Sequence, residues 1–264
     1  MFPNFRPRKQ SEQIDEQHSF GGLAAVSYDG NKLVNRRGIL RAGLALSAGG
    51  WLAGNSGAAA EEGLSNDSSP ADVLAYLYAG NERFAKGEPM AKHRNIERVR
   101  AVAKEQKPFA AFLGCADSRV PIEIVFDQGF GDLFVTRIAG NIASSENVGS
   151  LEFGTLVLGA KVLFVLGHSN CGAVAATIKA DEVPGQISGL FQHIRPAAKE
   201  AKGDLAIAVE VNVRNQATTL AESSPVIAKL VREKKLVIAG GVYDLSTGKV
   251  APVELPQLES GIHS

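Results

Sequence analysis

Short apolar runs alternate with amphipathic segments along the chain from about residue 70 onward. Five of these runs predict buried strands, because each is short and rich in Val, Leu, Ile or Phe. Four of them are bounded by Gly, Pro or Asp, and the fifth follows a helix-like segment. The predicted strands are Phe109–Leu113, Leu133–Thr136, Val162–Leu166, Leu205–Val213 and Leu236–Gly240.

Apolar residues at helical spacing predict helices between these strands. Val73, Leu77 and Phe84 share this spacing in a first helix that begins at residues 70–72 and ends near Gly87. The remaining predicted helices cover residues 95–106, 145–158, 172–180, 190–202 and 225–233. Strands that alternate with helices indicate an α/β fold, in which a mostly parallel central sheet is flanked by helices.

The first 60 residues have the order of an export signal. The basic pair Arg36–Arg37 precedes an apolar stretch, residues 42–54, and the small residues Ala58–Ala60. The paired arginines resemble a twin-arginine signal, and the stretch is shorter than the roughly 20 apolar residues of a membrane-spanning helix. We expect residues 1–60 to be cleaved, which places the mature chain in the periplasm or an equivalent extracytoplasmic space, without an integral membrane segment. The alternative is an amphipathic N-terminal helix of a cytoplasmic protein.

The rest of the chain divides into three parts. Residues 61–70 are rich in Ser, Asn, Asp and Gly and predict a flexible lead-in. Residues 71–255 form one predicted catalytic domain, and residues 256–264 form a tail. Hydrophobic residues make up 45% of the chain and charged residues 21%, which is typical of a globular protein. The net charge is zero and no positive cluster predicts a nucleic-acid surface, so a small-molecule substrate is favoured.

Two of the predicted strands lead directly into side chains that can bind a metal. Phe109–Leu113 is followed by Cys115, and Val162–Leu166 is followed by His168 and Cys171. If these strands are neighbours in a parallel sheet, both motifs open into one crevice at its carboxyl edge. Two thiolates and one imidazole are a strong ligand set for zinc, and three protein ligands leave the fourth position free, as in catalytic sites. The sequence therefore predicts one Zn²⁺ per chain, held by Cys115, His168 and Cys171.

Asp117 and Arg119 are the candidates for a catalytic pair beside this metal. Asp117 lies two residues after Cys115, and Arg119 can form a bidentate pair with it. In the paired state, Asp117 stays ionised and can accept a hydrogen bond from zinc-bound hydroxide. In the unpaired state, the carboxylate could become a fourth ligand and close the site. Two thiolates cancel the charge of the metal, so the bound water needs such help to lose its proton near neutral pH.

Each of these features also has a structural interpretation. A buried cysteine is usually a small hydrophobic residue, and two cysteines of an exported protein can form a disulfide. A redox role for Cys115 and Cys171 is a further interpretation, although 55 residues separate them and no C-x-x-C motif is present. The occurrence of all these residues together, at the ends of two predicted strands, favours the metal site.

The segments Cys115–Pro121 and Gly167–Ala173 resemble the two signature motifs of the β-class carbonic anhydrases. The resemblance extends over about residues 71–254. It implies a parallel-cored sheet, a zinc ion on the three ligands named above, and the Asp117–Arg119 pair as the dyad of that family. Further matching segments are Gly131–Arg137, Ala139–Asn141, Gly240–Asp244 and Thr247–Val250.

The resemblance also implies substrate contacts and an assembly. Gln106 resembles a glutamine that hydrogen-bonds the substrate, and Phe134 resembles an aromatic residue that lines the CO2 pocket, often across a dimer interface. Gly172, like Gly129, Gly131 and Gly140, is expected to allow close approach of the backbone around the site. A helical arm, residues 71–106, is expected to pack on a partner in a homodimer or higher homo-oligomer. Phe112 stands where a bicarbonate-inhibited subgroup has Trp, so that allosteric pocket is not expected.

The predicted reaction is the reversible hydration of CO2 to bicarbonate and a proton, by attack of zinc-bound hydroxide on CO2. One alternative is a hydrolase of a CO2 analogue, carbonyl sulfide or carbon disulfide, because the metal chemistry is the same. Another is a non-catalytic protein that binds zinc or bicarbonate. The sequence does not identify the proton shuttle, for which His93 and His193 are the candidates.

Overall fold

The computed structural model describes residue 64, residues 67–180 and residues 182–256 of the chain. The predicted signal, residues 1–60, lies outside the described residues, as do parts of the predicted lead-in and nearly all of the predicted tail. Within the described ranges, no helix is both long enough and apolar enough to span a membrane.

Five strands form one sheet in the order β2-β1-β3-β4-β5. The first four run parallel, and β5 pairs with β4 in the antiparallel direction. The strands are β1 (Ala110–Gly114), β2 (Leu133–Arg137), β3 (Val162–His168), β4 (Val237–Tyr243) and β5 (Val250–Val253). Every residue of β1 and β3 is buried, as expected for parallel strands covered on both faces. The prediction of a mostly parallel sheet flanked by helices is therefore confirmed.

The helices follow the strands in the order expected of an α/β fold. Four of them begin with a side chain that caps the first turn, namely Ser69, Asn95, Asp204 and Ser224. The helices are α1 (Pro70–Ala85), α2 (Ile96–Val102), α3 (Ile122–Val125), α4 (Ser145–Glu152), the π-helical turn η1 (Phe153–Val157), α5 (Gly172–Lys179), α6 (Ile187–Glu200), α7 (Leu205–Ser223) and α8 (Pro225–Arg232).

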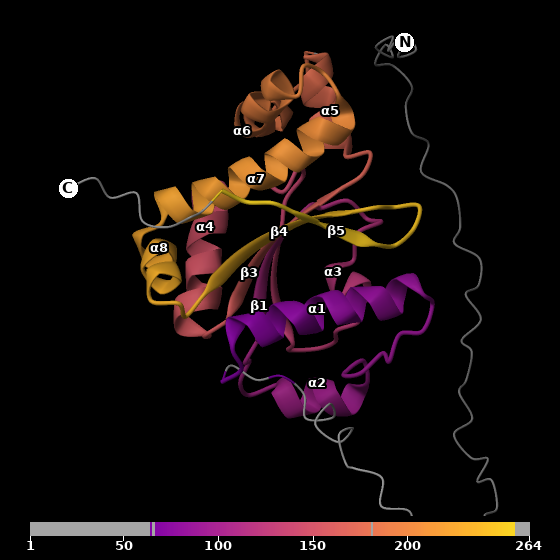
Figure 1. Ribbon diagram of the computed structural model, residues 1–264, viewed down its shortest axis with the longest axis vertical. Coiled ribbons are helices and arrows are strands. Elements are labelled where there is room, and N and C mark those ends of the chain that lie inside the picture. The colour runs from indigo at the N-terminus through magenta and orange to yellow at the C-terminus, as the bar shows by residue number, and fades with distance from the viewer. Residues whose placement is uncertain (1–63, 65–66, 181, 257–264) are drawn as a thin grey trace, which may run out of the picture. The chain divides into compact units, whose positions relative to one another are not determined.

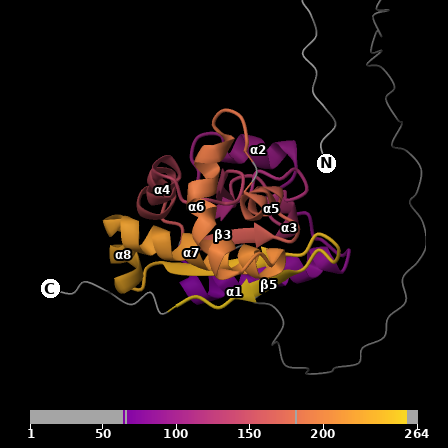
Figure 2. The ribbon, with the colours of Figure 1, turned by 90° about the horizontal axis from the view of Figure 1, so that it is seen from above.

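Two apolar layers hold the helices against the two faces of the sheet. Successive side chains of a strand point to opposite faces, so Phe112 and Leu113 of β1 belong to different layers. Phe112 packs with Leu77 of α1 and Ile122 of α3, whereas Leu113 lies in the cluster that contains Leu220 of α7. Both ribbon views place α4 and α8 to the left of β3 and α3 to its right (Figures 1 and 2).

The prediction of a strand at Leu205–Val213 is wrong, because these residues form the first half of α7. Val alternates with polar residues in the second half of this run, which imitates the two-residue period of a strand. The side chain of Asp204 caps the helix by accepting a hydrogen bond from the Ile207 amide at 2.9 Å. Buried positions then continue at helical spacing as far as Leu220.

Three smaller differences concern short elements and helix ends. The predicted helix 95–106 is confined to α2, residues 96–102. The end of the predicted helix 145–158 becomes the π-helical turn η1. The short helix α3 and the edge strand β5 were not predicted, because each has only four residues and shows no full period of either pattern.

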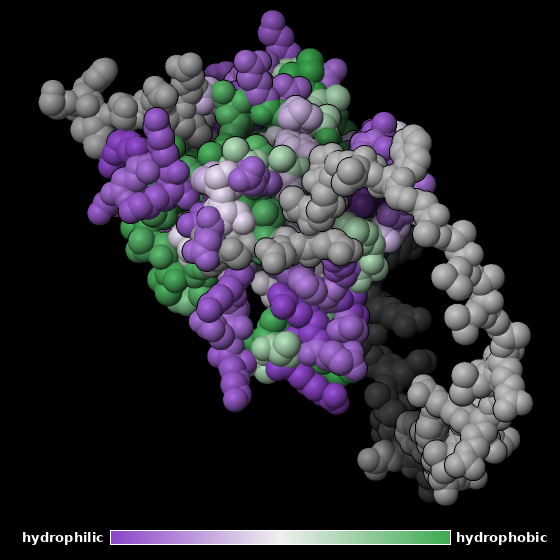
Figure 3. All heavy atoms as spheres, turned by 60° about the horizontal axis from the view of Figure 1, so that its bottom comes forward, coloured by the Kyte–Doolittle hydropathy of each residue, from purple (hydrophilic) through white to green (hydrophobic). Residues whose placement is uncertain are grey.

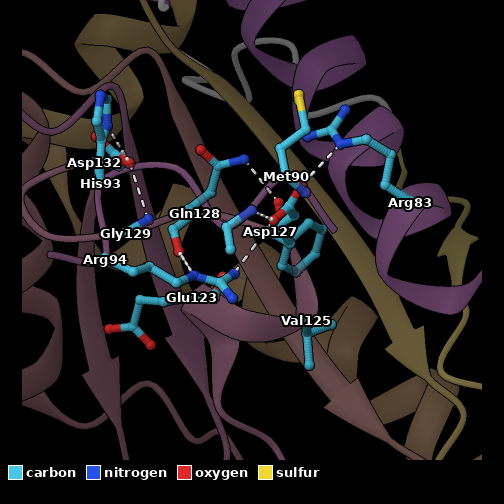
Figure 4. A network of polar contacts seen from close by, with 12 residues as sticks. Arg83, Met90, His93, Arg94, Glu123, Val125, Asp127, Gln128, Gly129 and Asp132 are labelled. Atoms are coloured by element: carbon cyan, nitrogen blue, oxygen red, sulfur yellow. Dashed lines mark hydrogen bonds and ion pairs between the residues drawn. The ribbon is translucent and has the colours of Figure 1, made fainter. Parts of the chain in front are cut away.

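The N-terminal arm packs in part on its own chain. Leu77 of α1 is buried against the sheet, whereas α2 has no buried residue. The loop between the two helices is fixed by the buried carboxylate of Asp127, which accepts hydrogen bonds from Arg83 Nε at 2.8 Å and from the amides of Met90 and Ala91 at 2.9 Å (Figure 4). The part of the arm that remains available to a partner is therefore α2 and the segment that follows it.

Asn81 joins α1 to the end of the chain. Its side-chain amide donates hydrogen bonds to the carbonyl oxygens of Val125 at 3.0 Å and of Gly248 at 2.9 Å. Its Oδ1 accepts a hydrogen bond from the amide of Val250, the first residue of β5, at 2.8 Å. One buried side chain thus connects the first helix, α3 and the last strand.

We expect Asp127→Asn to lower the free energy of unfolding by about 3 kcal/mol, the usual cost of breaking a buried charge pair. Burial tends to raise the pKa of Asp127, but the hydrogen bonds from Arg83, Met90 and Ala91 outweigh burial and lower it overall. A depressed folded-state pKa stabilises the fold fully above the unfolded value of about 3.9. That contribution is lost as the pH falls through the folded pKa.

Urea unfolding of the wild type and the variant as a function of pH checks this prediction. The difference between them should stay constant from about pH 7 to pH 5 and shrink below about pH 4. A difference that does not depend on pH would assign the effect to packing rather than to the charge of Asp127.

Candidate metal centre

Strand order explains why two distant cysteines and a histidine meet. β1 and β3 are parallel neighbours, with Gly114 paired to Leu166, so their carboxyl ends lie at the same edge of the sheet. Cys115 follows β1 directly, and His168 is the last residue of β3. Cys171 then occupies the position before the first turn of α5, which stands above this edge in Figure 1.

The three side chains form a compact and buried set. One sulfur or ring-nitrogen atom from each of Cys115, His168 and Cys171 lies within 4.8 Å of the others. Both cysteines are free thiols, which rules out the disulfide interpretation for this structure. The His168 ring is fully buried, and its Nδ1 lies 3.0 Å from the Ser169 carbonyl oxygen, whereas its Nε2 is buried without a hydrogen-bond partner. A buried nitrogen without a partner, beside two thiols, is the arrangement that a tetrahedral metal site requires.

Proton affinities in the set are strongly perturbed. A hydrogen bond from the Cys171 thiol lowers the pKa of Cys115 to about 4, and the same contact raises the pKa of Cys171. Burial tends to lower the pKa of His168, but the negative charge of the nearby Cys115 and Asp117 groups raises it overall. Negative charge on one sulfur therefore opposes loss of the proton from the other. A divalent cation would favour loss of that proton, because metal ligands bind as thiolates.

Asp117 and Arg119 form the predicted bidentate pair at the mouth of this set. Arg119 donates from Nε to Oδ1 of Asp117 at 2.9 Å and from a terminal nitrogen to Oδ2 at 2.8 Å. The Arg119 amide adds a third hydrogen bond to Oδ1 at 2.9 Å. The hydrogen bond from the Arg119 side chain is the largest cause of a pKa of Asp117 well below its usual range. Oδ2 of the resulting carboxylate lies 3.8 Å from Nε2 of His168.

Two contacts on Cys115 and Asp117 were not predicted from the sequence. Arg137, at the end of β2, donates hydrogen bonds to the carbonyl oxygen of Cys115 at 2.9 Å and to that of Asp117 at 2.5 Å. The amide of Gly140 points at the sulfur of Cys115, at 3.4 Å. A signal for Arg137 was present, because it directly follows the predicted strand Leu133–Thr136, at the same edge of the sheet as Cys115. For Gly140, the sequence indicated close approach of the backbone around the site but not its contact with the sulfur of Cys115.

The predicted substrate residues Gln106 and Phe134 do not lie beside Cys115 of their own chain. Gln106 precedes β1, whose five residues span about 13 Å, and Cys115 follows it. Lys107, next to Gln106, lines a pocket with Asp132 at the amino ends of the strands. Phe134 pairs with Ala111 near the start of β1. Within one chain, therefore, only the metal set and the Asp–Arg pair come together, with Gly172 at the start of α5 adjoining Cys171.

The two candidate proton shuttles have other contacts. Nδ1 of His93 lies 2.8 Å from Oδ1 of Asp132, which precedes β2 at the amino ends of the strands. The ring of His193, on α6, lies 3.4 Å from the side-chain nitrogen of Gln192. The structure brings neither ring into the Cys115–His168–Cys171 set among the residues it describes.

The parallel sheet, with a buried Cys–His–Cys set at its carboxyl edge and an ion pair at the mouth, defines an α/β protein with a candidate metal centre. A family model described as carbonic anhydrase matches residues 110–250. The carbonic anhydrase of Mycolicibacterium smegmatis is 36% identical over 192 residues, which cover 70% of this chain and 93% of that protein. Carbonic anhydrase 2 of Mycobacterium tuberculosis H37Rv is 34% identical over 191 residues, covering 69% and 92%. The chain belongs to the β-class carbonic anhydrase family, and it is an enzyme of that family.

Solved structures of the same class share this fold. A Coccomyxa β-carbonic anhydrase in complex with acetazolamide superposes with a TM-score of 0.53 at 26% identity, over 70% of this chain and 86% of that one. A tetrameric β-carbonic anhydrase from Sordaria macrospora gives a TM-score of 0.56 at 20% identity, over 69% and 97%. At 20% identity, the likeness to the Sordaria macrospora structure supports the fold and nothing further.

Proposed function

We propose that each chain binds one Zn²⁺ ion through Cys115, His168 and Cys171 and catalyses the reversible hydration of CO2 to bicarbonate and a proton. The observation that carries this proposal is the buried ring of His168, which has a nitrogen within 4.8 Å of both sulfurs and whose Nε2 has no hydrogen-bond partner. Family membership supports the same activity. Zinc on two thiolates and one imidazole would supply a water of lowered pKa in its open position.

The chain itself would contribute a fixed acceptor beside that position. Asp117 is held ionised by Arg119, so its carboxylate can accept a hydrogen bond and orient a nucleophile for attack on CO2. Arg119 also holds the carboxylate away from His168, at 3.8 Å. Release of this ion pair would free Asp117 to become a fourth ligand, which would close the site. Gly172, exposed at the start of α5 and without a side chain, would let substrate approach.

We further propose that the site is completed by a second copy of the chain. Gln106 and Phe134 lie toward the amino end of β1, away from Cys115 of their own chain, so they would reach the site of a partner. β2 is an edge strand, and next to its Phe134 the turn η1 exposes Phe153, Leu156 and Val157. Apolar side chains appear on the left of Figure 3, the side on which Figure 1 places α4 and α8. An apolar patch beside an unpaired strand edge is the kind of surface that a homodimer buries.

The test is a stopped-flow assay of the full chain after loading with zinc, with CO2, carbonyl sulfide and carbon disulfide compared at equal concentration. Faster turnover of CO2 supports the proposal. Preference for either sulfur-containing substrate would instead favour the hydrolase alternative. Stoichiometric zinc without turnover of any of the three would favour a non-catalytic binding protein.

We expect Asp117→Ala to retain about one zinc per chain and to hydrate CO2 about 10²- to 10⁴-fold more slowly, the usual contribution of a positioned acid–base group. Metal analysis and stopped-flow assays on the same preparation measure both quantities. Glu233→Gln is the control, because Glu233 is a carboxylate at the exposed end of α8 that forms ion pairs with Lys229 and Lys235. Full activity in zinc-loaded Asp117→Ala would remove this residue from the mechanism.

A further inference from the structure

Two buried side-chain amides lie one turn apart on α7, close to the metal set. Asn212 and Gln216 are 1% and 3% exposed, although α7 is otherwise apolar on this side. Nε2 of Gln216 donates a hydrogen bond to Oδ1 of Asn212 at 3.1 Å. Burying two amides costs free energy unless every group is satisfied, so their partners are informative.

Both amides hold one loop of backbone, residues 140–143. Nδ2 of Asn212 donates to the carbonyl oxygen of Gly140 at 2.9 Å. Oε1 of Gln216 accepts from the amide of Ala143 at 2.8 Å. The second hydrogen of Gln216 Nε2 goes to the carbonyl oxygen of His193 on α6 at 3.1 Å. Asn212 and Gln216 therefore fix the two ends of this loop, at Gly140 and Ala143. The hydrogen bond to His193 in turn fixes Gln216 against α6.

The loop places a single backbone N–H on a metal-binding sulfur. The amide of Gly140 lies 3.4 Å from Sγ of Cys115. Gly140 has φ +76°, and a Cβ on it would lie 2.6 Å from Cδ1 of Ile194, so any other residue here would strain the backbone and displace the end of Ile194. An N–H that faces a thiolate withdraws electron density from the sulfur, and such outer hydrogen bonds tune a metal through its ligand.

We infer that Asn212 and Gln216 are positioning residues, which hold the Gly140 amide on the Cys115 sulfur and so limit how much charge that thiolate donates to the metal. The inference rests on the proposed metal site. It gives a reason for the buried amide pair that packing does not supply. With two thiolate ligands, any reduction in sulfur donation leaves more positive charge on the metal, which favours ionisation of a bound water.

The test uses full-length protein loaded with Co²⁺ in place of zinc, because bands of sulfur-to-cobalt charge transfer report the electron density on the thiolates. We expect Asn212→Ala to bind one cobalt per chain and to show this band at longer wavelength than the wild type. The zinc form of the variant should hydrate CO2 about 10- to 100-fold more slowly, as is typical for loss of an outer-shell partner.

Asn81→Ala is the matched control, because Asn81 is an equally buried amide that holds backbone on the other face of the sheet. It should destabilise the protein without moving the band. Gln216→Met is a second variant of similar length, and a smaller shift in the same direction is expected. An unmoved band in whichever α7 variant folds, or an equal shift in Asn81→Ala, would overturn the inference. Failure of the wild type to show any sulfur-to-cobalt band would overturn the metal site as well.

Discussion

We expect the Cys171→Ala variant to lose its zinc and, with it, CO2 hydration above the uncatalysed rate. Only Cys115 and His168 would remain, and two ligands do not hold zinc against exchange with water in a site built for three. The removed sulfur is buried at the start of α5, and the nearby carboxylate of Asp117 is held by Arg119. Metal content per chain by mass spectrometry and stopped-flow hydration of CO2 measure the two losses together.

Thr177→Val separates loss of a ligand from damage to α5. Thr177 is buried on the same helix, and its hydroxyl donates to the Ala173 carbonyl oxygen at 2.8 Å. This variant should keep its zinc and its activity. Stoichiometric zinc in purified Cys171→Ala would contradict the ligand assignment, whatever its activity.

Mixing two inactive variants restores activity if Gln106 acts across a dimer interface. Cys171→Ala lacks a ligand but keeps Gln106, and Gln106→Ala has the reverse defect. In a mixed dimer, the intact metal set of one chain meets the intact Gln106 of the other. Random exchange of equal amounts makes half of the dimers mixed, each with one complete site, so about one quarter of the wild-type activity should return.

A mixture of Cys171→Ala with Cys115→Ala is the matched control. All three metal residues come from one chain in the structure, so no mixed dimer of these variants has a complete set. This mixture should stay inactive after subunit exchange by dilution and reconcentration. If the Gln106→Ala mixture also stays inactive while exchange is shown by mass, Gln106 does not act across the interface.

The sheet and the candidate metal set could be predicted from the sequence, because both depend on patterns within a few consecutive residues. β1 and β3 are short apolar runs buried on both faces, and each brings a residue of the candidate metal set, Cys115 or His168, to its carboxyl end. Parallel strands share their carboxyl edge, so a correct prediction of two strands was enough to bring Cys115 and His168 together. The Asp117–Arg119 pair followed from spacing alone, since its partners are two residues apart.

What the sequence did not reveal depends on contacts between distant elements. Reading Leu205–Val213 as a strand placed Asn212 in a different element from Gln216, so the two amides did not appear as neighbours one helical turn apart. The distance between Gln106 and Cys115 was likewise not predicted. A separation of nine residues does not show that the two residues lie at opposite ends of the same strand, β1. Asp127 gave no signal, since its partners Arg83 and Met90 lie 44 and 37 residues away.

The junction made by Asn81 has a consequence during synthesis on the ribosome. Its side chain needs Gly248 and Val250, which are among the last described residues to be translated. Until these residues emerge, Asn81 of α1 lacks two of its hydrogen bonds. The apolar face of α1 is therefore not yet held in place by the end of the chain. Chaperone binding to ribosome-bound intermediates should therefore persist until about the point at which β5 leaves the exit tunnel, and then fall.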